Sequence, residues 1–130
     1  MSVQERMLIS PVMSGAAGTV DTTAVVYPFT ENATIERAYI VPTLAVAADA
    51  SDTITITATF DSQNIFSFAT TTGAGGALTK DTPVEQTILT ALSGTKRELT
   101  KGSVVTFGVA KANSGKAYEL HVVLVYKLVN

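Results

Sequence analysis

His121 is the only histidine among the 130 residues, and the chain has no cysteine. Without cysteine, disulfides, thiolate nucleophiles, zinc–thiolate sites and iron–sulfur clusters are excluded. Neither neighbour of the histidine in Leu120-His121-Val122 is a serine or an aspartate. A catalytic triad can assemble from distant segments, but a lone histidine in a strand is more often a structural surface residue. We therefore expect no catalytic residue, no metal centre, no cofactor and no enzymatic activity.

Two other segments contain residues of the kind that hold ligands. Gly73-Ala74-Gly75-Gly76 could cradle a phosphate, but neither a Gly-Lys-Ser/Thr ending nor a helix follows it, as phosphate loops require. Asp49 and Asp52 could contribute to a calcium site, which takes about six to eight oxygen ligands. Aspartates in Asp49-Ala50-Ser51-Asp52 are equally typical of a turn. We prefer a loop and a turn here, and leave calcium binding open as an alternative.

The charge balance of the chain limits its partners. The formal net charge is −2, and only 15% of the residues are charged, against about 25% in an average domain. No basic patch with interleaved aromatic residues stands out, so nucleic acid is not expected as a partner. Acidic residues prevail before Lys80 and basic residues from Lys80 onward. Either interleaved strands mix these charges over the surface, or an acidic face of one copy pairs with a basic face of another. In both cases, a surface with so few charged residues predicts an oligomer.

The N-terminal residues carry no targeting signal. Their apolar run, Met7-Leu8-Ile9, is short and soon meets Pro11, whereas a secretory signal has a longer apolar stretch after positive charge. No apolar stretch approaches the length of about 18 residues that spans a bilayer. We therefore expect a protein that is made in a cytosol and has no membrane partner.

Alternation of apolar and polar residues predicts strands along most of the chain. In Thr53–Phe60 it places apolar residues on one face and threonines on the other. The strand near the C-terminus, Glu119–Leu128, is partly apolar on both faces, so we expect it at the centre of a sheet or against a neighbouring subunit. Further strands are expected at 23–29, 35–42, 64–70, 84–90 and 105–109.

Alternation leaves the side-chain orientation of one strand open. In the strand that ends at Pro42, the buried set is either Ile35, Tyr39 and Val41 or the opposite set with Ala38 and Ile40. Four aromatic side chains are expected to point into the core, which leaves few for a sugar-binding platform; they are Tyr39, Phe60, Phe107 and Tyr126.

These elements indicate an all-β domain with an N-terminal extension. Seven or eight short strands with a turn about every 8–12 residues are typical of an antiparallel β-sandwich or small barrel, here at residues 19–130. Residues 1–18 are expected to form an extended arm, with Ser14–Gly18 as its hinge. Either this arm binds a partner and orders on binding, or it is the first strand of the sandwich. Its candidate anchors are Met7, Leu8, Ile9, Val12 and Met13.

Two parts of the chain resemble a known group of proteins. The first runs through Ala33–Pro42, Ala47–Asp52 and Thr53–Phe60; the second is Leu99–Phe107, followed by Asn113-Ser114-Gly115 and the last strand. Both resemble the small jelly-roll virion proteins of tailed bacteriophages, in which a Thr-x-Gly-x-Val turn launches the penultimate strand.

This resemblance implies a jelly-roll fold and a capsid decoration, or cement, protein. Such a protein is often a homotrimer, sits on the outside of the icosahedral head and stabilises the lattice of the major capsid protein, with no small-molecule substrate. The alternatives are a receptor- or glycan-binding β-sandwich of a tail or fibre, and a coat subunit that assembles by itself.

Overall fold

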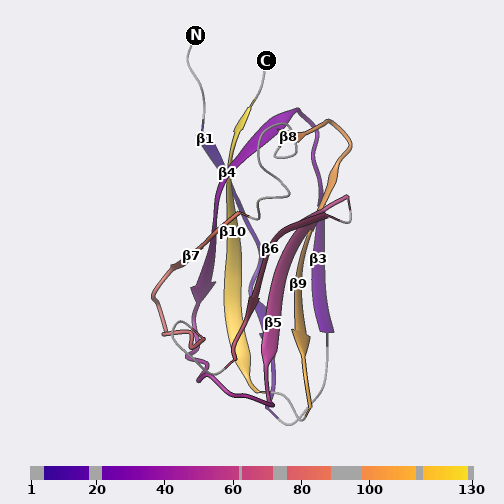
Figure 1. Ribbon diagram of the computed structural model, residues 1–130. Helices are drawn as coiled ribbons and strands as arrows, with labels where there is room; N and C mark the ends of the chain where they lie inside the picture. Colours follow the sequence, from indigo (N-terminus) through magenta and orange to yellow (C-terminus); the bar gives the residue numbers. More distant parts are fainter. Residues whose placement is uncertain are drawn as a thin grey trace.

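The computed structural model describes residues 5–17, 22–61, 63–71, 76–88, 98–113 and 116–128. These residues form two antiparallel sheets and contain no helix, as expected for an all-β protein (Figure 1). Sheet A has the order β1-β10-β4-β7, with β2 also on β10 and β8 also on β4. Its strands are β1 (Glu5–Ile9), β2 (Met13–Gly15), β4 (Ala33–Pro42), β7 (Val84–Gln86), β8 (Glu98–Leu99) and β10 (Tyr118–Leu128). Sheet B has the order β3-β9-β5-β6, with β3 (Thr22–Pro28), β5 (Ile54–Phe60), β6 (Gln63–Ala69) and β9 (Val104–Lys111).

The path of the chain between the sheets is that of a jelly roll. β1 and β2 follow one another along one edge of β10, and β7 and β8 both pair with β4, so that the ten segments fill eight strand positions. The chain then alternates between the sheets, except at the β5–β6 hairpin, which stays within sheet B. This is the double-sheet arrangement of an eight-stranded jelly roll. The fold class expected from the sequence is confirmed.

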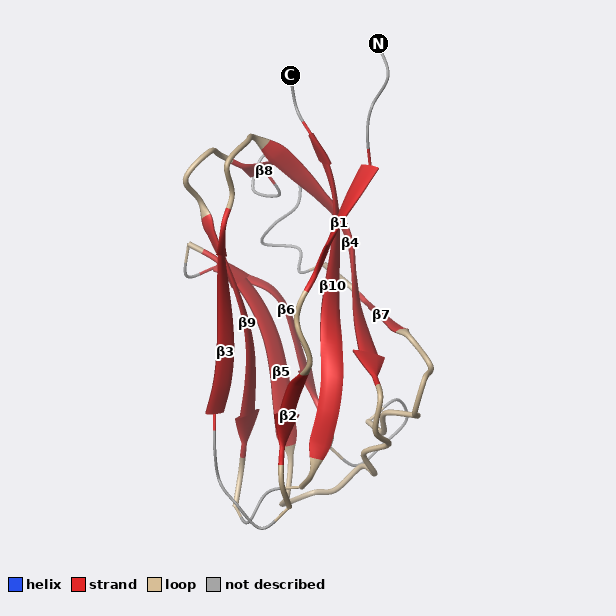
Figure 2. Ribbon diagram, turned by 180° about the vertical axis from the view of Figure 1, so that it is seen from behind, coloured by secondary structure: helices blue, strands red, loops and turns tan. Residues whose placement is uncertain are grey.

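The described part of the expected arm is an edge strand of sheet A. β1 pairs with β10 from Glu5 opposite Lys127 to Ile9 opposite Val123, and β2 continues along the same strand (Figure 2). Between them, Ser10 keeps the pairing: its backbone N–H donates to Val122 O at 2.9 Å, and its hydroxyl oxygen accepts from Val122 N at 2.8 Å. Residues 1–4 and 18 lie outside the described residues.

The far end of β2 is fixed to the opposite sheet by Lys111. This lysine, the last residue of β9, is 8% exposed. Its Nζ donates to Ala16 O at 2.5 Å and lies 5.4 Å from the centre of the Tyr118 ring. A Cβ at Gly15 would come within 2.6 Å of Tyr118, so only glycine allows this close approach. The edge strand is therefore held at its middle and at its end.

The hydrophobic core lies between the two sheets. Every second residue of β5 is fully or almost fully buried, and its threonines lie on the outer face, as the alternation predicted. β9 and β10 supply inward-facing residues in the same way. The fully buried side chains include Ile35, Ile40, Ile54, Ile56, Ile65, Phe66, Leu99, Phe107 and Tyr118.

Two β-bulges change which face a strand buries. In β4, Arg37 pairs with Val125 and Ile35 with Tyr126, which leaves Glu36 as the extra residue. Ile35 and Ala38 consequently both point inward although they are three residues apart. In β6 the shift lies at Ile65, so that Ile65 and Phe66 are both buried. Neither of the two alternation patterns considered for β4 is therefore right along its whole length.

The turn before β9 needs a glycine. Gly102 has φ +96°, in the region that favours glycine, and its N–H donates to Phe29 O at 2.8 Å. Ser103 N donates to Thr100 O at 2.9 Å and closes the turn. This is the Thr-x-Gly-x-Val segment, with Val104 as the first residue of β9. At the expected 84–90 strand, β7 ends at Gln86, and residues 89 and 90 lie outside the described residues.

Candidate binding surface

His121 points to the outer face of sheet A. Its Nδ1 lies 2.8 Å from Ser10 O, and its neighbour across the sheet on β4 is Val41. The imidazole thus helps to hold the edge strand through backbone contact. Among the residues that the structure describes, no group of three or more His, Asp or Glu side chains could hold a metal ion.

Asp49 braces the loop before β5. Its Oδ1 accepts hydrogen bonds from Ser51 N at 2.9 Å, Asp52 N at 3.0 Å and the Ser51 hydroxyl at 3.2 Å. Its Oδ2 lies 3.5 Å from Lys116 Nζ. The backbone hydrogen bonds from Ser51 and Asp52 lower the pKa of Asp49 from 3.8 to about 2. A lysine ammonium and backbone N–H donors thus surround the carboxylate. A calcium ion would need further oxygen ligands at these positions, so the arrangement favours a turn over a calcium site.

The glycine loop of the sequence analysis is only partly described. Residues 73–75 lie outside the described residues, and Gly76 is buried. A Cβ at Gly76 would come within 3.3 Å of the Ala48 side chain and much closer to the backbone oxygen of Thr71. At this position the glycine is explained by close backbone approach.

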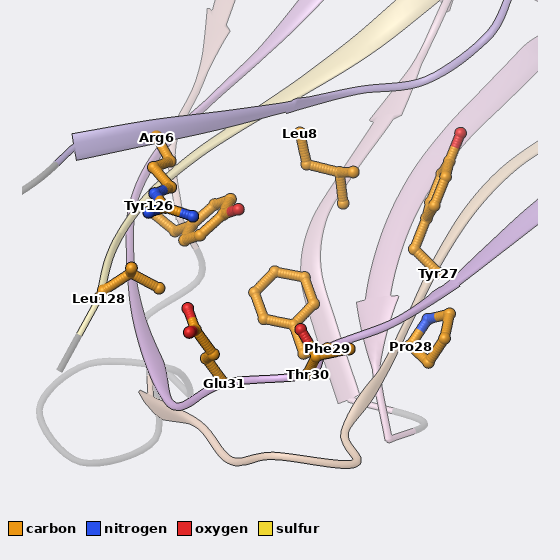
Figure 3. A pocket seen from close by; sticks show the side chains of 9 residues that line it. All are labelled: Arg6, Leu8, Tyr27, Pro28, Phe29, Thr30, Glu31, Tyr126 and Leu128. Carbon is orange, nitrogen blue, oxygen red and sulfur yellow. The ribbon is translucent and has the colours of Figure 1, made fainter. Parts of the chain in front are cut away.

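A small pocket lies where β1, β3 and β10 meet at one end of the sandwich (Figure 3). Its volume is about 150 Å³. Phe29 and Tyr126 lie in its wall with ring centres 5.0 Å apart. Its lining residues are Arg6, Leu8, Tyr27, Pro28, Phe29, Thr30, Glu31, Tyr126 and Leu128. Ligand pockets usually measure about 300–1,000 Å³, so this one could take no more than a small group.

The outer face of sheet A carries a larger apolar surface. One row across the sheet holds Met7 and Val125, and the next holds Ile9, Val123 and Tyr39. Met7 is 63% exposed and Ile9 53% exposed, whereas Val125 between its neighbours is almost fully buried. With Val41 from the following row, we call these residues the sheet A apolar face: Met7, Ile9, Tyr39, Val41, Val123 and Val125.

Charged side chains border this face at both ends and on the side of β7. At one end Arg37 forms an ion pair with Glu5, and Lys127 lies 3.8 Å from Glu36. Glu85 of β7 follows Tyr39 in the same row, at the far edge of the sheet. Glu119 marks the opposite end, where its carboxylate accepts a hydrogen bond from the Thr43 hydroxyl at 2.7 Å. An apolar centre inside a charged rim is the usual anatomy of a protein–protein contact surface.

The five candidate anchors of the N-terminal segment divide between two surfaces. Because β1 is a strand, its side chains alternate, and Met7 and Ile9 point outward while Leu8 packs against the core. Val12, in the kink after Pro11, is 50% exposed, whereas Met13 is 1% exposed and belongs to the core. Three of the five are therefore available for contact, and Leu8 and Met13 hold the segment on the domain.

Sequence reasoning missed the part of this face that lies on β4 and β10. Tyr39 was expected in the core, but the bulge at Glu36 turns it outward, where it is half-buried. Val123 and Val125 were recognised only as the second apolar face of the last strand. That double apolar pattern was the available signal, and the expected central position of β10 in its sheet is confirmed.

Comparison with models of known protein families gives no match, and a search among curated proteins finds no similar sequence. The described residues include no helix long and apolar enough to cross a membrane.

Proposed function

We propose that this chain is a virion structural protein, a capsid decoration or cement protein of a tailed bacteriophage. It binds the outside of the icosahedral head as a homotrimer and stabilises the lattice of the major capsid protein. The observation that carries the proposal is the sheet A apolar face, with its exposed Met7 and Ile9 inside a charged rim. The resemblance of the β4–β5 and β9 segments to small jelly-roll virion proteins supports it independently.

The chemistry of this face suits contact with another protein. Burial of the exposed halves of Met7 and Ile9 contributes about 1 kcal/mol each. β1 is anchored by Ser10 and Lys111, so these side chains are presented on an ordered strand and lose little backbone entropy on binding. The charged rim then sets orientation and excludes wrong partners more than it adds affinity.

The stabilising mechanism is mass action on the assembled lattice. A protein that binds the assembled shell, and not its separate subunits, stabilises the shell by its binding free energy. A modest contact is sufficient because it is repeated at every equivalent position of the shell. Met7, Ile9 and Val12 are the capsid-binding residues of the N-terminal segment in this account, with Tyr39 and Val123 beside them.

A charge placed on the apolar face tests the proposal. Ile9→Lys adds an ammonium at a half-exposed position of an edge strand, where folding should tolerate it. We expect its affinity for heads assembled without the protein to fall by about tenfold or more, because the new charge must be desolvated. The measurement is the fraction of bound protein at increasing concentration, after sedimentation of the heads.

The control is Ala77→Lys, which adds the same charge at an exposed loop residue outside both sheets. Unchanged affinity of Ile9→Lys, with both variants folded, would contradict the proposed docking surface. Point substitution is preferable to deletion of Met1–Met13, because deletion also removes β1 and the buried side chain of Met13.

The alternative of a receptor- or glycan-binding tail protein has one observation in its favour, the pocket walled by Tyr27, Phe29 and Tyr126. Its volume of about 150 Å³ would accept little more than part of one sugar ring. Copy number in purified virions separates the candidates. Hundreds of copies in each particle support the decoration protein, or a coat subunit if the chain forms shells alone, and tens of copies support a tail component.

A further inference from the structure

Charge is distributed very unequally between the two sheets. Lys111 is the only charged residue in the four strands of sheet B, and it points inward to Ala16. The strands of sheet A, by contrast, carry Glu5, Arg6, Glu36, Arg37, Glu85, Glu98, Glu119 and Lys127. The chain is already poor in charge, and sheet B is the part of it where charge is missing.

The outward side chains of sheet B are small and uncharged. One row across the sheet runs Ala24, Gly108, Thr57 and Ser67. We call the whole set the sheet B uncharged face: Ala24, Val26, Pro28, Thr55, Thr57, Thr59, Asn64, Ser67, Ala69, Val104, Thr106, Gly108 and Ala110. Such a surface costs little to desolvate, because no ion has to leave water.

This face also exposes large apolar side chains. Val26 is 56% exposed and Val104 38% exposed. Pro28 pairs with Val104, and Val26 lies two residues from Pro28 on the same face of β3, so the three residues are neighbours at one edge of sheet B. The carboxylate of Asp61 lies at this end of the face, where it accepts a hydrogen bond from Val104 N at 3.1 Å, but no strand of the sheet directs a charged side chain outward. Exposed valines on such a face indicate a surface that another layer of protein covers.

The size and relief of the face favour a second β-layer. Four strands spaced by about 4.8 Å and seven residues of about 3.4 Å give a footprint of about 450 Å² for each copy. Two such faces meet over about 900 Å², at the low end for a specific interface. Short side chains make the layer flat, and flat sheets stack face to face at about 10 Å. The expected contact is therefore weak in dilute solution and favoured by crowding on a particle.

We infer that the sheet B uncharged face is the contact between copies of this chain. Every copy presents the same uncharged layer, so no unpaired charge is buried when two copies meet through it. The charged residues of sheet A then point away from the contact, which limits repulsion between copies of net charge −2. Identical faces that meet in this way are related by a twofold axis, so the contact joins copies in pairs and is separate from the contacts within the proposed homotrimer.

The test is the mass of the purified protein over micromolar to millimolar concentration, measured by sedimentation equilibrium without any capsid. Thr57→Lys places an ammonium at the centre of the face, and Ala24→Lys places one in the same row at an exposed edge position. The second variant guards against misfolding of the first. Ile9→Lys is the matched control, with the same charge added to sheet A.

We expect wild type and Ile9→Lys to exceed the monomer mass of 13.6 kDa, and both sheet B variants to dissociate at least about tenfold more readily. A wild type that stays monomeric throughout, or folded sheet B variants that assemble like wild type, would overturn the inference. A dimer that Thr57→Lys dissociates supports the inference, because identical faces meet about a twofold axis. If Ile9→Lys loses binding to heads but self-associates like wild type, the capsid-binding face and the face between copies are separate surfaces.

Discussion

Asp49 carries the one clearly shifted pKa among the described residues. Two backbone N–H groups and the Lys116 ammonium favour its carboxylate form in the folded protein. Its folded pKa of about 2 lies below the ordinary value of 3.8, so the group stabilises the fold above pH 3.8. This contribution is lost as the pH falls from 3.8 towards about 2.

Asp49→Asn should therefore have a lower Tm than wild type near neutral pH, and the difference should shrink as the pH falls from about 4 towards 2. The measurement is thermal unfolding followed by circular dichroism across this range. Asp81→Asn, which removes the carboxylate of an exposed turn aspartate, is the control for the loss of one surface charge. If added calcium raises the Tm of wild type, the interpretation of Asp49 as a turn residue only is contradicted, and a calcium site is supported.

At the residue scale, the sequence indicated the roles of the polar residues better than their partners. The turn hydrogen bonds expected at Asp49 are present, because Asp-x-Ser-Asp offers backbone donors close in sequence. Lys116 could not be foreseen beside it, since 67 residues separate the two and only the fold brings them together. The backbone contact of His121 with Ser10 was unpredictable for the same reason.

At the scale of the element, the edge strand depends on one serine. Ser10 is 2% exposed, and its hydroxyl oxygen accepts the hydrogen bond of Val122 N at 2.8 Å where Pro11 interrupts the pairing. The same hydroxyl donates to Pro11 O at 2.9 Å. Alanine at this position would leave the buried N–H of Val122 without that acceptor.

We expect Ser10→Ala to lower the free energy of unfolding by about 1–3 kcal/mol, measured by urea denaturation. Ser14→Ala is the matched control, because Ser14 is an exposed residue of β2 and its hydroxyl should contribute little. Equal stability of the two variants would show that the edge strand does not depend on this hydrogen bond.

The strands were predictable from alternation, but their bulges were not. Thr53–Phe60 repeats strictly and forms β5 with the expected buried face. A glycine inside a strand often marks a bulge or a close backbone approach, and at Gly108 the pairing of β9 runs on both sides without a shift, so no bulge lies there. The shifts lie at Glu36 and Ile65, where the sequence gives no special residue. The position of a bulge depends on packing between neighbouring strands, so it cannot be predicted from the sequence of one strand alone.

At the scale of the whole molecule, the sandwich was predictable and the distribution of charge was not. The sequence divides into an acidic and a basic half at Lys80, which left two alternatives: charges mixed by interleaved strands, or complementary acidic and basic faces. In the fold, Glu5 pairs with Arg37 and Glu36 lies beside Lys127, so charges of both signs share sheet A. A jelly roll sends successive segments to alternate sheets, so a charge sum along the chain cannot reveal a contrast between sheets.

The resulting picture is a thin sandwich with a different chemistry on each side. Sheet A presents an apolar centre with an ion-paired rim, and sheet B presents a flat layer without charge. Neither side resembles the evenly charged surface of a solitary domain. We therefore propose that both sides contact protein, sheet A the shell and sheet B other copies of the chain.

The most direct measurement is a density map, at side-chain resolution, of phage heads saturated with the protein. The account predicts Ile9 and Val123 against the major capsid protein, with the sheet B uncharged face turned towards neighbouring copies. A map in which the protein is absent from the shell, or bound to it with the sheet A apolar face open to solvent, would contradict the account.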